Sequence, residues 1–162
     1  MPFLVEIASD QTHWVGSCGP LVVLFWKEGV APEVCLRLPE LAHGLARRQS
    51  DGRVGVLSVT SPAAPAPSGE ARKALVRLVR DTQSTVSRFA IVREGQGFVA
   101  SVAASIVTGI QMLAEPGSPH KIFLRLEEGI RWVTVGLGEF AAAPDRIEEV
   151  VAAVQEQRRK LV

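Results

Sequence analysis

The sequence predicts an α/β domain: a mixed, mostly parallel sheet of four or five strands covered by helices. Short apolar runs rich in β-branched residues alternate with stretches that have the spacing of amphipathic helices. That order is typical of parallel strands joined by helices. The chain is also long enough for one domain with its own core, since it has 162 residues, of which 47% are hydrophobic and 22% charged.

The expected strands follow from two kinds of apolar pattern. Phe3, Val5 and Ile7 occupy every second position, which predicts a first strand at an edge of the sheet. Residues 16–20 are rich in glycine, serine and proline and are expected to form a turn after it. Residues 21–26 are apolar on both faces, as in a central strand of a parallel sheet, and further strands are expected in the later runs rich in apolar residues. These runs cover residues 21–26, 54–60, 86–93 and 121–124.

Helices are expected between these strands and after the last one. Pro39 would lose a hydrogen bond and clash with the preceding turn inside a helix, so a short turn at residues 32–38 is expected before a helix at residues 39–49. Residues 61–67 predict an extended, proline-rich loop, and Ser68 is the expected N-cap of the clearest helix in the chain. The remaining helices are expected at residues 95–114, at residues 127–135 and from about Pro144 onward.

The chain is expected to consist of a main domain, residues 1–143, and a helical extension, residues 144–162, that binds a partner or a second copy. The stretch 95–114 has no charged residue, and its length alone would span a membrane. Polar residues such as Gln96 and Ser101 make it only weakly hydrophobic, so we expect a helix buried against the sheet and no membrane span. The N-terminus lacks the basic and long apolar regions of a signal peptide.

The titratable residues do not form a pattern typical of an enzyme or a metal site. His13, His43 and His120 are far apart in the sequence, and the histidine nearest to Cys35 lies eight residues away. We therefore expect no catalytic residue, no metal and no cofactor. A net charge of +1 gives no general attraction for nucleic acid. Cys18 and Cys35 fit no disulfide framework and are expected to be reduced thiols of a cytoplasmic protein.

Two groups of residues are candidates for binding. A phosphate on Ser68 would be stabilised by the helix N-terminus and by Arg72, which makes Ser68 a candidate phosphosite. The residues expected to contact a protein partner near it are Pro65, Pro67, Glu70, Arg72, Lys73 and Arg77. The second group would form the mouth of a small-ligand site, although it is shorter than the phosphate-binding glycine motifs. It consists of Gly95, Gln96, Gly97 and Phe98.

Three phrases carry a resemblance to a known family: Phe-Trp-Lys-Glu-Gly at residues 25–29, Ser-Gly-Glu-Ala-Arg-Lys-Ala-Leu at 68–75 and Gly-Gln-Gly-Phe-Val-Ala at 95–100. With the strand–helix order, they make residues 21–135 similar to the STAS superfamily (sulphate transporter and anti-sigma-factor antagonist), in particular its bacterial anti-sigma-antagonist-like branch. The resemblance implies a small non-enzymatic regulator with a mixed sheet. It also implies a strand-to-helix loop whose serine or threonine is phosphorylated by a partner kinase.

The loop that carries this serine in the family departs from the family pattern here. It is typically Asp-Ser-Ser-Gly or close to it and would fall between Thr60 and Gly69. This chain has a longer, proline-rich loop without the motif. Ser61 and Ser68 are the residues that could take the role, so both are candidate phosphosites.

These observations favour a cytoplasmic signalling or regulatory module of bacterial type, not an enzyme. It would bind a protein partner, a kinase or another regulator, through residues 61–80, gated by serine phosphorylation. A second hypothesis is a small-ligand protein that encloses a lipid or a nucleotide, with residues 95–98 at the mouth. A third is a self-assembling structural subunit, a homo-oligomer formed through the small residues Ser101, Ser105 and Gly109 or through the C-terminal helix.

Overall fold

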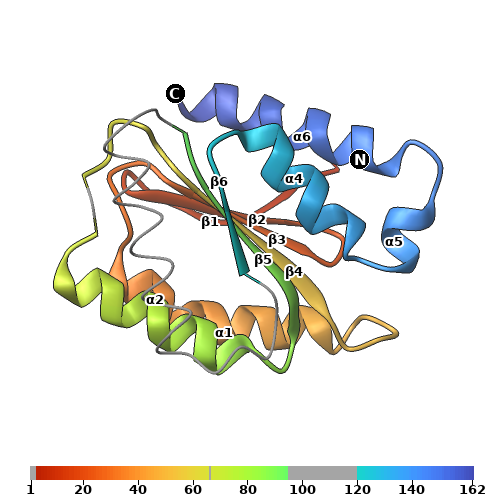
Figure 1. Ribbon diagram of the computed structural model, residues 1–162, viewed down its shortest axis with the longest axis horizontal. Helices are drawn as coiled ribbons and strands as arrows, with labels where there is room; N and C mark the ends of the chain where they lie inside the picture. Colours follow the sequence, from red (N-terminus) through yellow and green to blue (C-terminus); the bar gives the residue numbers. More distant parts are fainter. Residues whose placement is uncertain (1–2, 66, 95–119) are drawn as a thin grey trace.

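A mixed sheet of six strands runs through the middle of the molecule (Figure 1). The computed structural model describes residues 3–65, 67–94 and 120–162. The strands lie side by side in chain order; β1, β2 and β3 are antiparallel, and β3 to β6 are parallel. They are β1 (Val5–Ser9), β2 (His13–Cys18), β3 (Leu21–Trp26), β4 (Val54–Thr60), β5 (Val86–Arg93) and β6 (His120–Phe123). The predicted α/β class is confirmed, but the sheet is larger and more mixed than expected.

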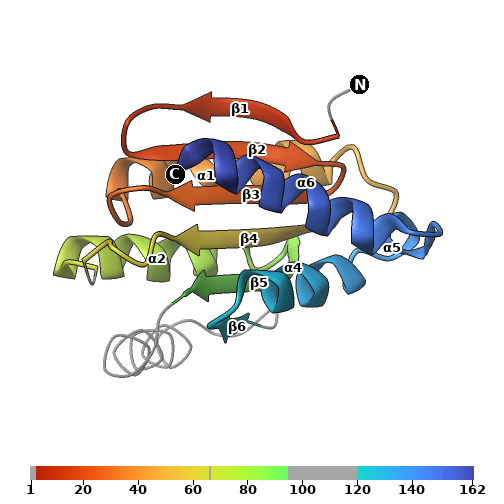
Figure 2. The same ribbon diagram turned by 90° about the horizontal axis from the view of Figure 1, so that it is seen from above.

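Helices cover both faces of this sheet, which gives three layers (Figures 1 and 2). One face carries α1 (Pro32–Ala46) and α2 (Gly69–Thr82), which connect the parallel strands β3, β4 and β5. The other face carries α4 (Leu126–Val135) and α6 (Arg146–Leu161), with the short α5 (Glu139–Ala142) between them. Within the described part of the chain, no helix is both long and apolar enough to cross a membrane.

The additional strand is β2, where the sequence predicts only a connection and a turn. It pairs with β3 along its whole length, from His13 opposite Trp26 to Cys18 opposite Leu21. Position 16 of this strand requires glycine, because the Trp14 indole fills the space beside it. A Cβ on Gly16 would lie 2.1 Å from Trp14 Cη2. The small residues of this stretch therefore reflect close packing within the sheet. The turn itself is shorter than predicted and centres on Gly19, whose φ is +55°.

Helix α1 also differs from the prediction, because it continues through Pro39. A proline inside a helix costs about 3 kcal/mol or more. That cost is offset by one continuous buried face, to which Val34 and Leu38 belong on the N-terminal side of Pro39 and Ala42 on the other. Burial of a valine or leucine side chain contributes about 1.5–3 kcal/mol. The start of α1 at Pro32 therefore reflects burial of its apolar face more than the backbone preference of Pro39.

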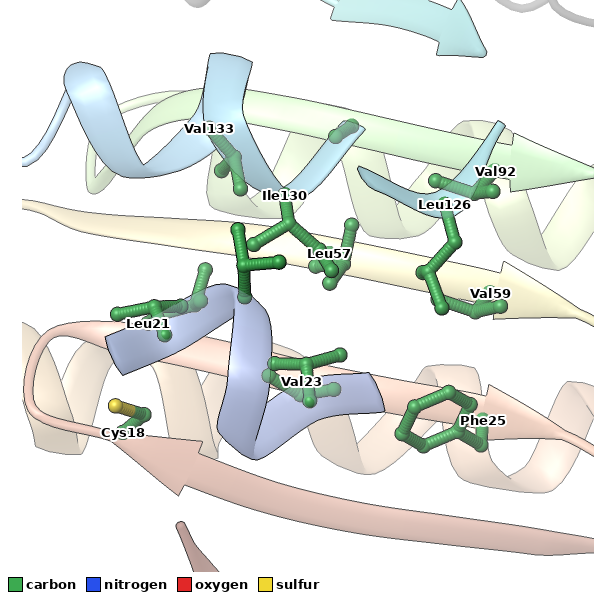
Figure 3. Packing of buried hydrophobic residues seen from close by; sticks show 14 of the residues in the cluster. Cys18, Leu21, Val23, Phe25, Leu57, Val59, Val92, Leu126, Ile130 and Val133 are labelled. Atoms are coloured by element: carbon green, nitrogen blue, oxygen red, sulfur yellow. The ribbon is translucent and has the colours of Figure 1, made fainter. Parts of the chain in front are cut away.

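Two apolar cores hold the three layers together. The core under α1 and α2 includes Trp26, Val56 and Phe89. In the other core, side chains of α4 point toward those of the sheet (Figure 3). Helix α6 belongs to this second core, since Val150 and Val154 are fully buried in it. The apolar residues of the C-terminal helix are therefore already in contact with the rest of the domain.

Several predicted features lie outside the described residues. These are the uncharged helix at residues 95–114, the glycine-containing phrase Gly95, Gln96, Gly97 and Phe98, and the small residues Ser101, Ser105 and Gly109. The strands predicted at 21–26, 54–60 and 86–93 are confirmed. The predicted last strand is displaced by one residue, as His120–Phe123.

Candidate partner-binding site

The predicted partner-binding residues lie at and beyond the carboxyl ends of the parallel strands. The register places Trp26 of β3, Thr60 of β4 and Arg93 of β5 next to one another at this edge. From here the chain enters α1 and α2, so the N-termini of both helices lie at the same edge (Figure 2). Loops at the carboxyl ends of parallel strands are the usual position of binding sites in open α/β sheets.

The loop after β4 is folded back on itself at its start, and the prediction of an extended loop is wrong there. The Ser61 N–H donates to the Trp26 carbonyl at 3.1 Å, and the Ala64 N–H donates to the Ser61 carbonyl at 3.0 Å. The Ser61 hydroxyl accepts a further hydrogen bond from the Ala63 N–H at 3.4 Å. These bonds hold residues 61–64 as a turn, in which Ala64 is buried.

Arg93 of β5 stabilises this turn, a role that the sequence analysis does not predict. Its side chain is only 7% exposed, and its guanidinium donates to the Ala64 carbonyl. No carboxylate pairs with it in the described part of the chain. Burying a charge without a counter-charge is energetically costly. The hydrogen bond from Arg93 to the Ala64 carbonyl offsets part of this cost and stabilises the loop. The available signal was an arginine at the end of the otherwise apolar run 89–93.

Ser68 is the N-cap of α2, as predicted. Its Oγ accepts a hydrogen bond from the Ala71 N–H at 3.2 Å, and its backbone is extended, with φ −64° and ψ 169°. Ser68 is exposed, whereas Ser61 at the other end of the loop is half-buried. Of the two candidate phosphosites, Ser68 is therefore the more accessible.

The outward face of α2 carries the predicted basic residues. Arg72, Lys73 and Arg77 are exposed, while Leu75 and Leu78 on the opposite face are buried. Arg77 Nε lies 3.5 Å from Asp81 Oδ2. Arg72 and Lys73 form no ion pair with any residue that the structure describes, so both charges are available to a partner. Glu70 is exposed in the first turn of α2, and half-buried Pro67 precedes its N-cap. Pro65 is exposed and lies near Gly29, which follows β3.

A groove between α1 and α2 extends this surface. Its volume is about 460 Å³, and it contains Leu36, an apolar side chain that is 59% exposed. The sequence could not predict the groove, because it depends on α1 continuing through Pro39. The lining residues are Cys35, Leu36, Pro39, Glu40, His43, Arg47, Arg77 and Asp81.

Both cysteines are buried. Burial raises the pKa of both Cys18 and Cys35 to about 12, so both thiols are protonated at neutral pH. His13 Nδ1 lies 3.0 Å from Asp10 Oδ1, and His43 lines the groove between α1 and α2. Among residues 3–65, 67–94 and 120–162, no cluster of three or more potential metal ligands forms.

Comparison of the chain with family models, with curated proteins and with solved structures finds no match. The similarity to the STAS superfamily therefore stays a prediction.

Proposed function

We propose that the protein is a non-enzymatic signalling or regulatory module that binds a protein partner through the groove between α1 and α2 and the adjoining start of α2. The observation that carries this proposal is the exposed Leu36 side chain in a groove whose rim is charged. Protein interfaces combine apolar anchors in pockets with a polar rim, and a few anchors supply most of the binding energy.

The charges around the groove suggest the chemistry of the partner. Glu40, Arg47, Arg77 and Asp81 place both signs on the rim. Arg72 and Lys73 add two positive charges beside it that no described carboxylate neutralises. We expect a partner segment with one or two large apolar side chains for the groove and acidic residues facing α2. Complementary charge of this kind sets partner choice and association rate more than affinity.

Phosphorylation of Ser68 would regulate this surface. A phosphate at the N-terminus of α2 interacts favourably with the helix dipole and adds nearly two negative charges beside Arg72. It would oppose an acidic partner segment and weaken binding. Ser61 is the less suitable target, because it is half-buried, whereas Ser68 is exposed.

Self-association through α6, a further hypothesis from the sequence, has less support. The apolar residues Val150, Val151 and Val154 are buried against the sheet and α4, so α6 offers no free apolar face.

The proposal is tested with two matched surface variants. Leu36→Ser changes the groove, and Leu124→Ser changes an exposed leucine (46%) that follows β6. Partners are first captured with the wild-type protein in extract of the native cell and identified. Their dissociation constants are then measured with purified components. Leu36→Ser should weaken binding at least about tenfold, while Leu124→Ser should not change it. A partner bound equally well by both variants and the wild type would contradict the proposed surface.

A further inference from the structure

The groove between α1 and α2 is longer along α1 than along α2. On α1 its lining residues extend from Cys35 to Arg47, which corresponds to about 18 Å of helix. On α2 they are Arg77 and Asp81, which lie one turn apart. The two helices run side by side from the same edge of the sheet (Figure 1). The long axis of the groove therefore follows α1.

The wall that α1 forms has the spacing of a helix that packs against another helix. Leu36, Glu40, His43 and Arg47 line the groove and are separated by four, three and four residues. Residues three and four apart are neighbours on the surface of a helix, so these side chains follow one line along α1. Two helices that pack along such a line cross at about 20°. The wall therefore fits a third helix that lies along α1.

An occupant of this groove has to satisfy its own backbone hydrogen bonds. Both walls are helices, and the backbone groups of a helix are largely paired within it, except at its ends. An extended segment would find no strand edge here to pair with. It would leave N–H and C=O groups without partners where the contact excludes water, which is costly. A helix pairs these groups internally, so it is the conformation that the walls favour.

The charges of the groove indicate which side chains the occupant carries. Arg77 Nε and Asp81 Oδ2 lie 3.5 Å apart and compensate each other. Glu40 and Arg47 are exposed and form no ion pair with any residue that the structure describes. They are seven residues apart, or about two turns, and Leu36 lies about one turn before Glu40. The wall on α1 thus presents an apolar group, a negative charge and a positive charge in a row.

We propose, on the basis of the function proposed above, that the partner enters the groove as an amphipathic helix that matches this row. A large apolar side chain contacts Leu36, a basic side chain faces Glu40, and an acidic side chain faces Arg47. The three partner residues therefore lie on one face of the helix, at intervals of about one and two turns. Helices bound in grooves are commonly recognised through side chains at such intervals.

Nuclear magnetic resonance tests the conformation of the occupant. The probe is the isotope-labelled partner captured by the wild type, bound to the unlabelled full chain. Backbone carbon chemical shifts of the contacting segment should be those of a helix. An extended segment whose binding is weakened at least about tenfold by Leu36→Ser would overturn the helix and leave the proposed function standing. Capture of no partner, or a partner that Leu36→Ser does not affect, would contradict both.

Two arginines of α1 test the match of charge. Arg47→Gln should weaken partner binding at least about threefold and reduce its dependence on salt, because it removes the positive charge from the groove. Arg37→Gln removes an exposed arginine of the same helix from outside the groove, and it should leave binding unchanged. Unchanged affinity of Arg47→Gln, or equal weakening by the two variants, would overturn the acidic residue at Arg47.

Discussion

The two faces of the sheet are covered in different ways. On the α4 and α6 face, Arg131 joins the two helices: it lies 2.8 Å from Glu127 on α4 and 2.6 Å from Glu148 on α6. Between α1 and α2, both fully described, no ion pair forms, and a groove with an exposed leucine separates them at the surface. The helices α4 and α6 are thus joined by an ion-pair network, although a pocket of about 770 Å³ remains between the start of α4 and the end of α6. The helices α1 and α2 lack such a link and expose Leu36 in the groove between them.

The largest expected effect compares one apolar side chain from each face. Ile130→Ala should lower the free energy of unfolding by about 2–5 kcal/mol, because Ile130 is fully buried and its removal leaves a cavity. Leu36→Ala should change it by no more than about 0.5 kcal/mol, since Leu36 lies at the surface. Denaturant unfolding followed by circular dichroism measures both. Equal losses at the two positions would show that the α1 and α2 face contributes to stability as the other face does.

A pair of glycines sharpens the same comparison. A Cβ on Gly129 of α4 would lie 2.5 Å from Val92 Cγ2, whereas a Cβ on Gly44 of α1 would meet nothing closer than Arg47 Nη2 at 3.9 Å. Alanine in place of Gly44 should raise the free energy of unfolding by about 0.5–1 kcal/mol through helix propensity. The same change at Gly129 should lower it, because overpacking costs about 1–3 kcal/mol. Stabilisation by Gly129→Ala would mean that α4 packs less tightly than described.

The sequence predicts the parts of the fold that depend on local apolar pattern. Strand β3 is a continuous apolar run, and its limits are predicted to the residue. Strands β4 and β5 are predominantly apolar and lie where the sequence predicts them. Strand β2 and the continuation of α1 through Pro39 could not be predicted, because both depend on packing against other parts of the chain. Gly16 lies within a strand next to the Trp14 ring, and Pro39 is part of a helix held by the sheet.

The candidate site divides in the same way. The Ser68 cap and the basic face of α2 follow from local spacing and are confirmed. The bond from Arg93 to Ala64 joins residues 29 positions apart, and the groove requires two helices to be placed side by side. Neither leaves a pattern within a short stretch of sequence.

A smaller effect on stability is expected at Ser68. Ser68→Ala removes the cap of α2 and should lower the free energy of unfolding by about 1 kcal/mol, while Ser68→Asp keeps a capping oxygen and should leave it almost unchanged. Ser68→Asp should nevertheless weaken partner binding, because it adds a negative charge at the proposed surface. Thermal unfolding and affinity measurements on both variants separate the two effects. Unchanged affinity of Ser68→Asp would remove Ser68 from the proposed regulation.

The smallest expected effect concerns the ion pair that joins α4 and α6. The hydrogen bond from Arg131 lowers the pKa of Glu148 below its ordinary value of 4.5. The pair therefore stabilises the fold at pH values above the ordinary pKa of 4.5. This contribution is lost as the pH falls through the lower pKa that Glu148 has in the folded protein. Glu148→Gln should slightly reduce the thermal midpoint at neutral pH and not in strong acid. Glu139→Gln, which changes an exposed glutamate without an ion pair among the described residues, should have no effect at either pH. A Glu148→Gln effect that does not depend on pH would contradict this account.

Nuclear magnetic resonance of the isotope-labelled protein, titrated with the partner captured by the wild type, tests the division between the two faces most directly. We predict that amide shifts change along α1 and α2, around Leu36, His43 and Lys73, and that α4 and α6 are unaffected. Changes centred on α4 and α6, with the signals of α1 and α2 unmoved, would contradict the assignment of partner binding to the groove between α1 and α2.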